Sequence, residues 1–214
     1  MTTTSHPTRA ALFDLDGVVL DTESQYTRIW QRIGLTYRPD VEHLEQKIKG
    51  MTLASIFDAY FAGRELQAEI TRRLDEAEAG MTYGYVAGLP DFVADLRRHG
   101  IRTAIVTSSN NAKMANVYAA LPEFRAMFDA IITADRISRS KPDPECYLLA
   151  AAELGALPRH SCVFEDSFHG LEAGRRAAMH VVGLATTNPR HAIAPLADLV
   201  IDDFEGFGAD RLPW

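Results

Sequence analysis

The chain has 214 residues, of which 47% are hydrophobic and 24% charged, and its formal net charge is −7 at pH 7. This length can bury a substantial core and suits one domain with a sizeable insertion, or two small domains. Nucleic-acid and membrane-surface proteins need basic patches, so the acidic balance argues against both roles. No apolar run approaches the roughly 20 residues needed to span a bilayer. The start, MTTTSHPTR, lacks the apolar segment of a signal peptide.

The chain has two cysteines, Cys146 and Cys162. They are too few for a disulfide scaffold and lack the spacing of a metal site. We therefore expect buried thiols in a protein of the reduced cytoplasm.

The first element in the chain is an apolar run, Ala10–Phe13, that stops at Asp14 and Asp16. Such a run predicts a buried strand that ends at a site. Residues 22–84 then show apolar side chains at helical spacing, with Thr52 as a plausible helix N-cap. No strand candidate interrupts this block, so we expect it to be wholly helical.

After residue 90 the chain alternates between strands and helices. We expect strands at Ile101–Thr107, Ala130–Ala134, Ser161–Phe164, His180–Ala185 and Leu199–Ile201, with helices between them. This alternation predicts an α/β fold with a doubly wound, Rossmann-like parallel sheet. The expected core comprises residues 1–20 plus 86–214, and residues 21–85 form an inserted all-helical domain.

Acidic residues follow two of the expected strands. Asp14 and Asp16 end the first, and Glu165 and Asp166 end the strand at Ser161–Phe164. The carboxyl ends of parallel strands are where ligands bind, and clustered carboxylates repel one another unless a cation stabilises them. Mg²⁺ prefers such oxygen ligands. The alternative for an isolated Asp-x-Asp is that it only caps a turn.

Two further stretches carry possible anion chemistry. The run from Thr107 to Asn110 ends a strand and begins a helix, where hydroxyls and free N–H groups can bind an anion. Ordinary helix capping is its alternative. Lys141, in the sequence SKPDP, could neutralise charge during phosphoryl transfer, although a lone lysine before a helix is usually solvated.

Together these four pieces resemble the motifs of the haloacid dehalogenase superfamily of phosphotransferases. The DLDG sequence that begins at Asp14 is similar to the first motif, Thr107 to the second, Lys141 to the third, and Glu165-Asp166 to the fourth. The helical insertion resembles the small helical cap of the branch that includes beta-phosphoglucomutase and many sugar-phosphate phosphatases.

The resemblance implies a mechanism. Asp14 would attack phosphorus and become an aspartyl-phosphate, while Asp16 would protonate the leaving alkoxide and then activate water. Mg²⁺ would bind the carboxylates of Asp14, Asp166 and Glu165 and the backbone carbonyl of Asp16.

The same resemblance predicts the residues that hold the substrate. Thr107 and its neighbours would bind the phosphoryl oxygens, with positive charge from Lys141. A loop of the helical cap would face the leaving group. The expected substrate-binding residues are Ser108, Ser109, Asn110, Lys49 and Gly50. A solvated surface position is the alternative for Lys49, and His169 is expected on the surface or in a supporting role.

The resemblance leaves a phosphatase and a phosphomutase open, and two positions favour the phosphatase. Tyr26 stands where the mutase has a histidine, and Leu53 stands where it has an arginine that holds a second phosphate. Leucine cannot offer the bidentate fork that recognises phosphate. We therefore expect a phosphatase for a small phosphorylated sugar or polyol, with the oligomeric state left open. A catalytically silent binding protein on the same fold is the third alternative.

Overall fold

The computed structural model describes residues 7–214. Within them, strands pair into one parallel sheet of six strands in the order β3-β2-β1-β4-β5-β6. The strands are β1 (Ala10–Phe13), β2 (Arg102–Val106), β3 (Ala130–Ile132), β4 (Ser161–Glu165), β5 (His180–Leu184) and β6 (Leu199–Ile201). The predicted α/β fold with a parallel sheet is therefore confirmed, with strand ends shifted by one or two residues.

Helices connect the strands and also form the insertion after β1. The longer ones are α1 (Glu23–Tyr37), α3 (Leu53–Tyr60), α4 (Arg64–Ala79), α5 (Leu89–Arg98), α6 (Asn111–Ala120), α8 (Glu145–Glu153) and α9 (Phe168–Arg176). Three helices have only four residues: α2 (Leu44–Lys47), α7 (Phe124–Met127) and α10 (Arg190–Ile193). The first lies within the block expected to be helical, whereas α7 and α10 were not predicted. A single helical turn is too short to show the periodicity that identifies longer helices.

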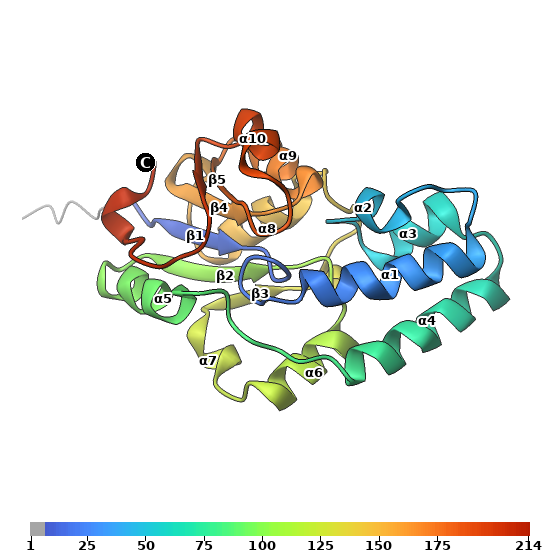
Figure 1. Ribbon diagram of the computed structural model, residues 1–214. Helices are drawn as coiled ribbons and strands as arrows, with labels where there is room; N and C mark the ends of the chain where they lie inside the picture. The colour runs from blue at the N-terminus through green and yellow to red at the C-terminus, as the bar shows by residue number, and fades with distance from the viewer. Residues whose placement is uncertain (1–6) are drawn as a thin grey trace, which may run out of the picture.

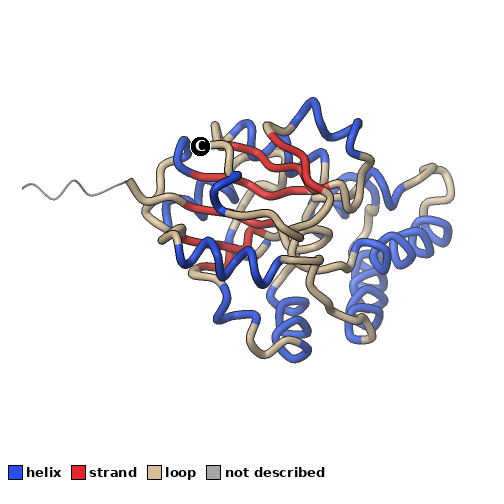
Figure 2. The backbone as a smooth tube through the Cα atoms, turned by 60° about the vertical axis from the view of Figure 1, so that its left-hand side comes forward, coloured by secondary structure: helices blue, strands red, loops and turns tan. Residues whose placement is uncertain are grey.

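The sheet lies between two layers of helices, as Figures 1 and 2 show. Neighbouring residues of β1 face opposite layers, because side chains alternate along a strand. Phe13 packs in the cluster that includes α5 and α7, and Leu12 packs in the cluster that includes α8 and α9. Both faces of the sheet are thus buried, which is why the strands are continuously apolar.

Helices α1–α4 pack around a hydrophobic cluster of their own, which includes Trp30, Phe61 and Ile70. They lie beyond the carboxyl ends of the strands, at the right of Figure 1. The two connecting segments run side by side: Asp21 N–H donates to the Gly84 carbonyl (2.9 Å), and Val86 N–H donates to the Val19 carbonyl (3.1 Å). We call residues 21–85 the helical cap; its boundaries as a domain stay a prediction.

Both cysteines are buried free thiols, as predicted. Within residues 7–214, no helix combines the length and the apolar character that a membrane crossing requires.

Candidate active site

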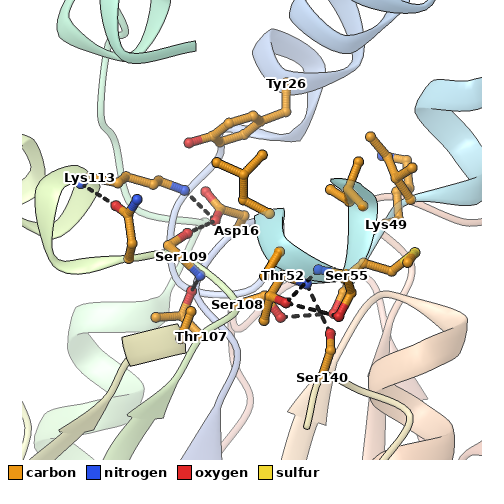
Figure 3. A pocket seen from close by; sticks show the side chains of 18 of the residues that line it. Asp16, Tyr26, Lys49, Thr52, Ser55, Thr107, Ser108, Ser109, Lys113 and Ser140 are labelled. Carbon is orange, nitrogen blue, oxygen red and sulfur yellow. Dashed lines mark hydrogen bonds and ion pairs between the residues drawn. The ribbon is translucent and has the colours of Figure 1, made fainter. Parts of the chain in front are cut away.

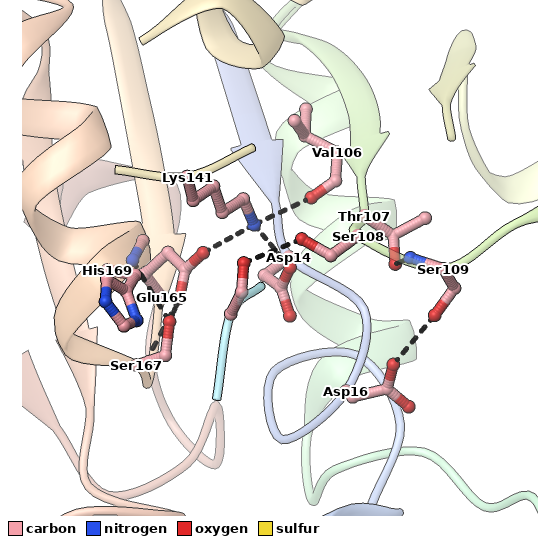
Figure 4. Close-up of polar contacts among 12 residues, drawn as sticks. Asp14, Asp16, Val106, Thr107, Ser108, Ser109, Lys141, Glu165, Ser167 and His169 are labelled. Carbon is pink, nitrogen blue, oxygen red and sulfur yellow. Dashed lines mark hydrogen bonds and ion pairs between the residues drawn. The ribbon is translucent and has the colours of Figure 1, made fainter. Parts of the chain in front are cut away.

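Lys141 joins the ends of three neighbouring strands. Its Nζ donates to Asp14 Oδ1 (2.6 Å) after β1, to Glu165 Oε1 (2.6 Å) at the end of β4, and to the Val106 carbonyl (3.1 Å) of β2. Figure 4 shows these contacts converging on the amino group. The side chain is only 2% exposed, so the solvated alternative for this lysine is wrong.

The buried charges at this point change each other's ionisation. Burial works to lower the pKa of Lys141, but Asp14 and Glu165 outweigh it and raise that pKa above its ordinary value. Burial also raises the pKa of Asp14, to about 7, although Lys141 opposes the rise. The lysine therefore stays a cation, directly beside the carboxylate expected to be the nucleophile.

Glu165 uses both carboxylate oxygens for contacts within the protein. Oε1 accepts from Lys141 and from the Tyr147 hydroxyl (2.8 Å), and Oε2 accepts from Ser167 Oγ (3.0 Å) and two backbone N–H groups. A Cβ atom at Gly170 would lie 1.8 Å from this carboxyl group, so only glycine leaves room for it. Glu165 is close enough to contribute to a metal site. Its contacts nevertheless indicate a structural anchor for the lysine.

Asp166 is different, because its Oδ2 is buried and has no hydrogen-bond partner within the described residues. Burial, together with Glu23, Glu165 and Asp14, raises its pKa well above the ordinary value. Ligand atoms of Asp14, Glu165 and Asp166 lie within 4.8 Å of one another. An orphaned carboxylate oxygen beside other carboxylates is the donor chemistry that a hard divalent cation needs. The residues therefore fit Mg²⁺.

Gly17 makes room for this oxygen. Its φ of +79° is a left-handed conformation that favours glycine, and a Cβ atom there would lie 2.2 Å from Asp166 Oδ2. The glycine of the DLDG sequence is thus explained by both backbone conformation and space.

Asp16 lies apart from the lysine and contacts another set of donors. It accepts hydrogen bonds from Thr22 Oγ1 (2.5 Å), Ser109 Oγ (3.2 Å) and Lys113 Nζ. Figure 3 shows Lys113 reaching Asp16 beneath Tyr26. The ammonium lies 4.2 Å from the centre of the Tyr26 ring, a cation–π contact between the core and the helical cap.

Lys113 is not among the residues predicted from the sequence, although it is 2% exposed and lines the pocket. The sequence held one weak signal. A cation in the first turn of a helix opposes the helix dipole, so its presence near the start of α6 needed a reason. The contact with Asp16 supplies that reason.

Hydrogen bonds hold the stretch from Thr107 to Asn110 in place at the end of β2. Thr107 Oγ1 accepts from Ser109 N–H (3.0 Å), and Asn110 Oδ1 caps α6 by accepting from Lys113 N–H (2.9 Å). Ser108 Oγ donates to the Gly50 carbonyl (2.8 Å) of the helical cap. Helix capping is therefore confirmed for Asn110, and all four residues also line the pocket.

The loop of the helical cap that was expected to face the substrate does contact the core. The Thr52 N–H donates a hydrogen bond to Ser140 Oγ (2.9 Å) of the core. His169 Nδ1, also of the core, lies 2.8 Å from the Lys49 carbonyl. The Lys49 ammonium pairs with Glu23, and its side chain is 12% exposed. Lys49 is therefore not a solvated surface residue, and His169 supports the loop.

A cavity of about 530 Å³ lies between the core and the helical cap (Figure 3). Core residues on its wall include Asp14, Asp16, Thr107 and Asp166. Cap residues on its wall include Tyr26, Trp30, Lys49, Gly50, Leu53 and Glu78. The expected catalytic and substrate-binding residues thus surround one cavity, with Lys141 buried beside Asp14.

Comparison with known proteins gives a consistent result. A sequence model of haloacid dehalogenase-like hydrolases matches residues 11–184. The chain is 34% identical to hexitol phosphatase A of Escherichia coli (94% of each chain covered). It is 32% identical to validoxylamine A 7'-phosphate phosphatase of Streptomyces hygroscopicus subsp. limoneus (91% of this chain, 93% of the relative). The crystal structure of CbbY from Rhodobacter sphaeroides in complex with phosphate is similar, with a TM-score of 0.78 and 26% identity (97% of this chain, 100% of that one).

Proposed function

The chain belongs to the haloacid dehalogenase-like hydrolase family, and on this basis we propose that it is a Mg²⁺-dependent phosphatase for a small sugar or polyol phosphate. The observation that carries the proposal is the pairing of Asp14, held by Lys141, with the orphaned oxygen of Asp166 at one cavity. A nucleophile, a cation site and a fixed positive charge are what phosphoryl transfer to a carboxylate requires.

Mg²⁺ would be held by the Asp14 and Asp166 carboxylates and, by the family resemblance, the Asp16 carbonyl. Bound there, it would shield the negative charge of an incoming phosphate from the carboxylates and favour the ionised form of Asp14. Glu165 acts differently in this proposal: its saturated hydrogen bonds fix Lys141.

In the first step, an Asp14 carboxylate oxygen attacks phosphorus, and the bond between phosphorus and the ester oxygen breaks. Asp16 gives its proton to the departing alkoxide, so the free alcohol leaves and an aspartyl-phosphate remains. Lys141 stays protonated at 2.6 Å from Asp14 Oδ1 and stabilises the charge that develops on the transferring group.

In the second step, Asp16 accepts a proton from water, whose oxygen attacks phosphorus. The bond between phosphorus and Asp14 breaks, which releases inorganic phosphate and restores the carboxylate. Thr22, Ser109 and Lys113 hold the Asp16 side chain for both transfers. The helical cap, whose loop hydrogen-bonds to the core, excludes bulk water from this site.

The test is phosphate release from a panel of sugar and polyol phosphates, with Mg²⁺ and with a chelator. We expect turnover that depends on Mg²⁺, and no release from any substrate would overturn the proposal. Adding β-glucose 1-phosphate with glucose 1,6-bisphosphate tests the phosphomutase alternative. Isomerised sugar phosphate without release of inorganic phosphate would establish that alternative. A cytoplasmic location is part of the proposal, supported by the two buried free thiols.

A further inference from the structure

The helical cap contributes an acidic wall to the cavity. Within residues 21–85, the cavity is lined by five carboxylates, Glu23, Glu45, Asp58, Asp75 and Glu78, and by one cation, Lys49. This wall faces the part of the substrate that leaves as the alcohol, because the phosphoryl group must lie at Asp14. Any charge on the leaving group therefore interacts electrostatically with the carboxylates of the helical cap.

Among residues 7–214, every cationic side chain that lines the cavity is already paired with a carboxylate. Lys49 pairs with Glu23 and Lys113 pairs with Asp16. Arg139 pairs with Asp143 (3.2 Å) and Glu145 (3.1 Å). An anionic group on the leaving alcohol would therefore have no unpaired cation among the cavity-lining residues. At the largely buried Lys49 and Lys113 pairs it would have to displace a carboxylate and leave that carboxylate uncompensated, whereas Arg139 is 66% exposed and solvent screens its charge.

Two carboxylates of the helical cap lie largely out of solvent while lining the cavity. Glu78 is 6% exposed and accepts from the Tyr26 hydroxyl (2.7 Å). The Glu45 side chain is 11% exposed, and His43 Nδ1 lies 3.5 Å from its Oε1. Carboxylates accept hydrogen bonds but cannot donate them when ionised. They therefore suit hydroxyl and ammonium groups, and they repel a second phosphate or a carboxylate.

The wall also has apolar residues, with Trp30, Leu53 and Phe57 among the lining residues. Leu53 begins α3, and its apolar side chain supplies no cation that could bind an anion at this position. Carbon-bound hydrogens of a sugar or polyol pack well against such side chains.

We infer that, given the proposed phosphatase activity, this site selects substrates by the charge of the leaving group. It accepts phosphate monoesters of hydroxylated alcohols that are uncharged or carry an amine, and it excludes those with a second phosphate or a carboxylate. The acidic wall of the helical cap and the pairing of every cavity-lining cation determine this selection.

Two matched substrate pairs test the inference with the wild-type protein and Mg²⁺. Glucitol 6-phosphate and 6-phosphogluconate differ at C1, which is a hydroxymethyl group in one and a carboxylate in the other. Glucose 6-phosphate and glucosamine 6-phosphate differ at C2, which carries a hydroxyl or an ammonium group. Repulsion between a carboxylate on the leaving group and the acidic wall is expected to change kcat/KM by about 30-fold at low salt. We expect kcat/KM to favour glucitol 6-phosphate over 6-phosphogluconate by about that factor, and glucosamine 6-phosphate to be at least as good as glucose 6-phosphate.

Variants then locate the selection in the helical cap. Glu78→Gln keeps an acceptor for Tyr26 but removes a charge, and it should reduce the preference for glucitol 6-phosphate over 6-phosphogluconate about three- to tenfold. Glu42→Gln removes the same charge from an exposed position outside the cavity and serves as the matched control. Leu53→Arg adds a cation and should raise kcat/KM for glucose 1,6-bisphosphate relative to glucose 6-phosphate, whereas Leu53→Met should not.

The outcomes separate the two proposals. Absence of phosphate release from all of these esters contradicts the phosphatase itself. If the enzyme is active but turns over 6-phosphogluconate as well as glucitol 6-phosphate, and glucose 1,6-bisphosphate as well as glucose 6-phosphate, charge selection is contradicted and the phosphatase proposal is not. A preference that Glu42→Gln changes as much as Glu78→Gln would also overturn the inference, because net charge and not the cavity wall would then determine it.

Discussion

The core and the helical cap arrange their charges in opposite ways. On the core side, Lys141 lies between two carboxylates and directs its charge at Asp14, while Asp166 has an oxygen without a partner. On the cap side, the cation of the cavity wall pairs with a carboxylate of the same domain, as Lys49 does with Glu23. The core thus presents charges that act on the phosphoryl group, whereas the cap presents one paired cation and an excess of carboxylates that repels anions.

This difference assigns the phosphoryl transfer to the core and the selection of the leaving group to the helical cap. The core site holds three carboxylates, Asp14, Glu165 and Asp166, beside one buried lysine, and a bound Mg²⁺ would relieve part of their repulsion. The helical cap supplies no nucleophile, acid or base in the proposed mechanism, so its contribution lies in which leaving group it admits.

Asp14→Asn should reduce turnover by about 10⁴-fold or more, because the amide cannot form the aspartyl-phosphate. The measurement is phosphate release with saturating Mg²⁺. Asp21→Asn, an exposed position in the same stretch, is the matched control and should retain activity. Substantial turnover by Asp14→Asn would show that the core does not supply the nucleophile.

Lys141→Met should lower kcat by about 10³-fold, because the positive charge beside the nucleophile is lost. It should also reduce the free energy of unfolding by about 3–5 kcal/mol, because Asp14 and Glu165 are left as uncompensated buried charges. The double variant Lys141→Met/Glu165→Gln should regain much of the stability but not the activity. Recovery of both would contradict a catalytic role for the lysine.

Lys113→Met should lower kcat by about 10²-fold, since Asp16 loses a partner that fixes its position. KM and the affinity for Mg²⁺ should change little, because the lysine does not contact Asp14 or Asp166. Lys113→Arg should restore part of kcat if charge and hydrogen bonding matter. An unchanged kcat in Lys113→Met would remove Lys113 from the proposed mechanism.

The affinity for Mg²⁺ should fall about tenfold per pH unit below pH 7, because a cation must displace the proton of Asp14, whose pKa is raised to about 7 by burial. The same shift makes the metal-free protein less stable as pH rises from 3.8 to about 7, since the native state then holds a proton that the unfolded chain has released. Calorimetric titration and chemical denaturation across this range measure the two effects. Asp14→Asn should remove the Asp14 contribution to both pH dependences, and the part that remains belongs to Asp166, whose pKa burial also raises.

Ser108→Ala should have the smallest effect, about fivefold in KM, because it removes a single hydrogen bond between the core and Gly50 of the helical cap. Steady-state kinetics with the best substrate of the panel measure it. Thr36→Ala, which removes an exposed hydroxyl bonded within α1, is the control. A larger loss in kcat than in KM would mean that Ser108 acts in the chemical step.

The sequence allowed the core to be predicted more fully than the cavity. Strands such as Ala10–Phe13 are short apolar runs that stop at polar residues, and this pattern depends only on local burial. It also placed Asp14 and Asp166 at strand ends, which the parallel sheet then brings to one edge. The predicted residues Thr107 and Lys141 lie at this edge for the same reason.

The contacts that depend on tertiary packing could not be predicted. From the sequence, Lys113 resembles a solvated lysine on a helix, because its partners Asp16 and Tyr26 lie far from it in the chain. Glu165 and Asp166 are adjacent in sequence, yet one is saturated with donors and the other is not. The pairing of Lys49 with Glu23 joins residues of two different segments, and no periodicity reveals it.

The paired aromatic rings of β1 and β4 have a consequence for the chemistry. Phe13 is aligned with Phe164, and their rings stack with centroids 4.6 Å apart. A slip of one residue between these strands would shift them by about 3.3 Å and turn each side chain to the opposite face. The stacked rings therefore help to fix the relative positions of Asp14 and Glu165, the carboxylate residues that follow them directly in the chain. We expect a substitution that disturbs this stack to lower catalytic activity, through misplaced carboxylates, before it unfolds the protein.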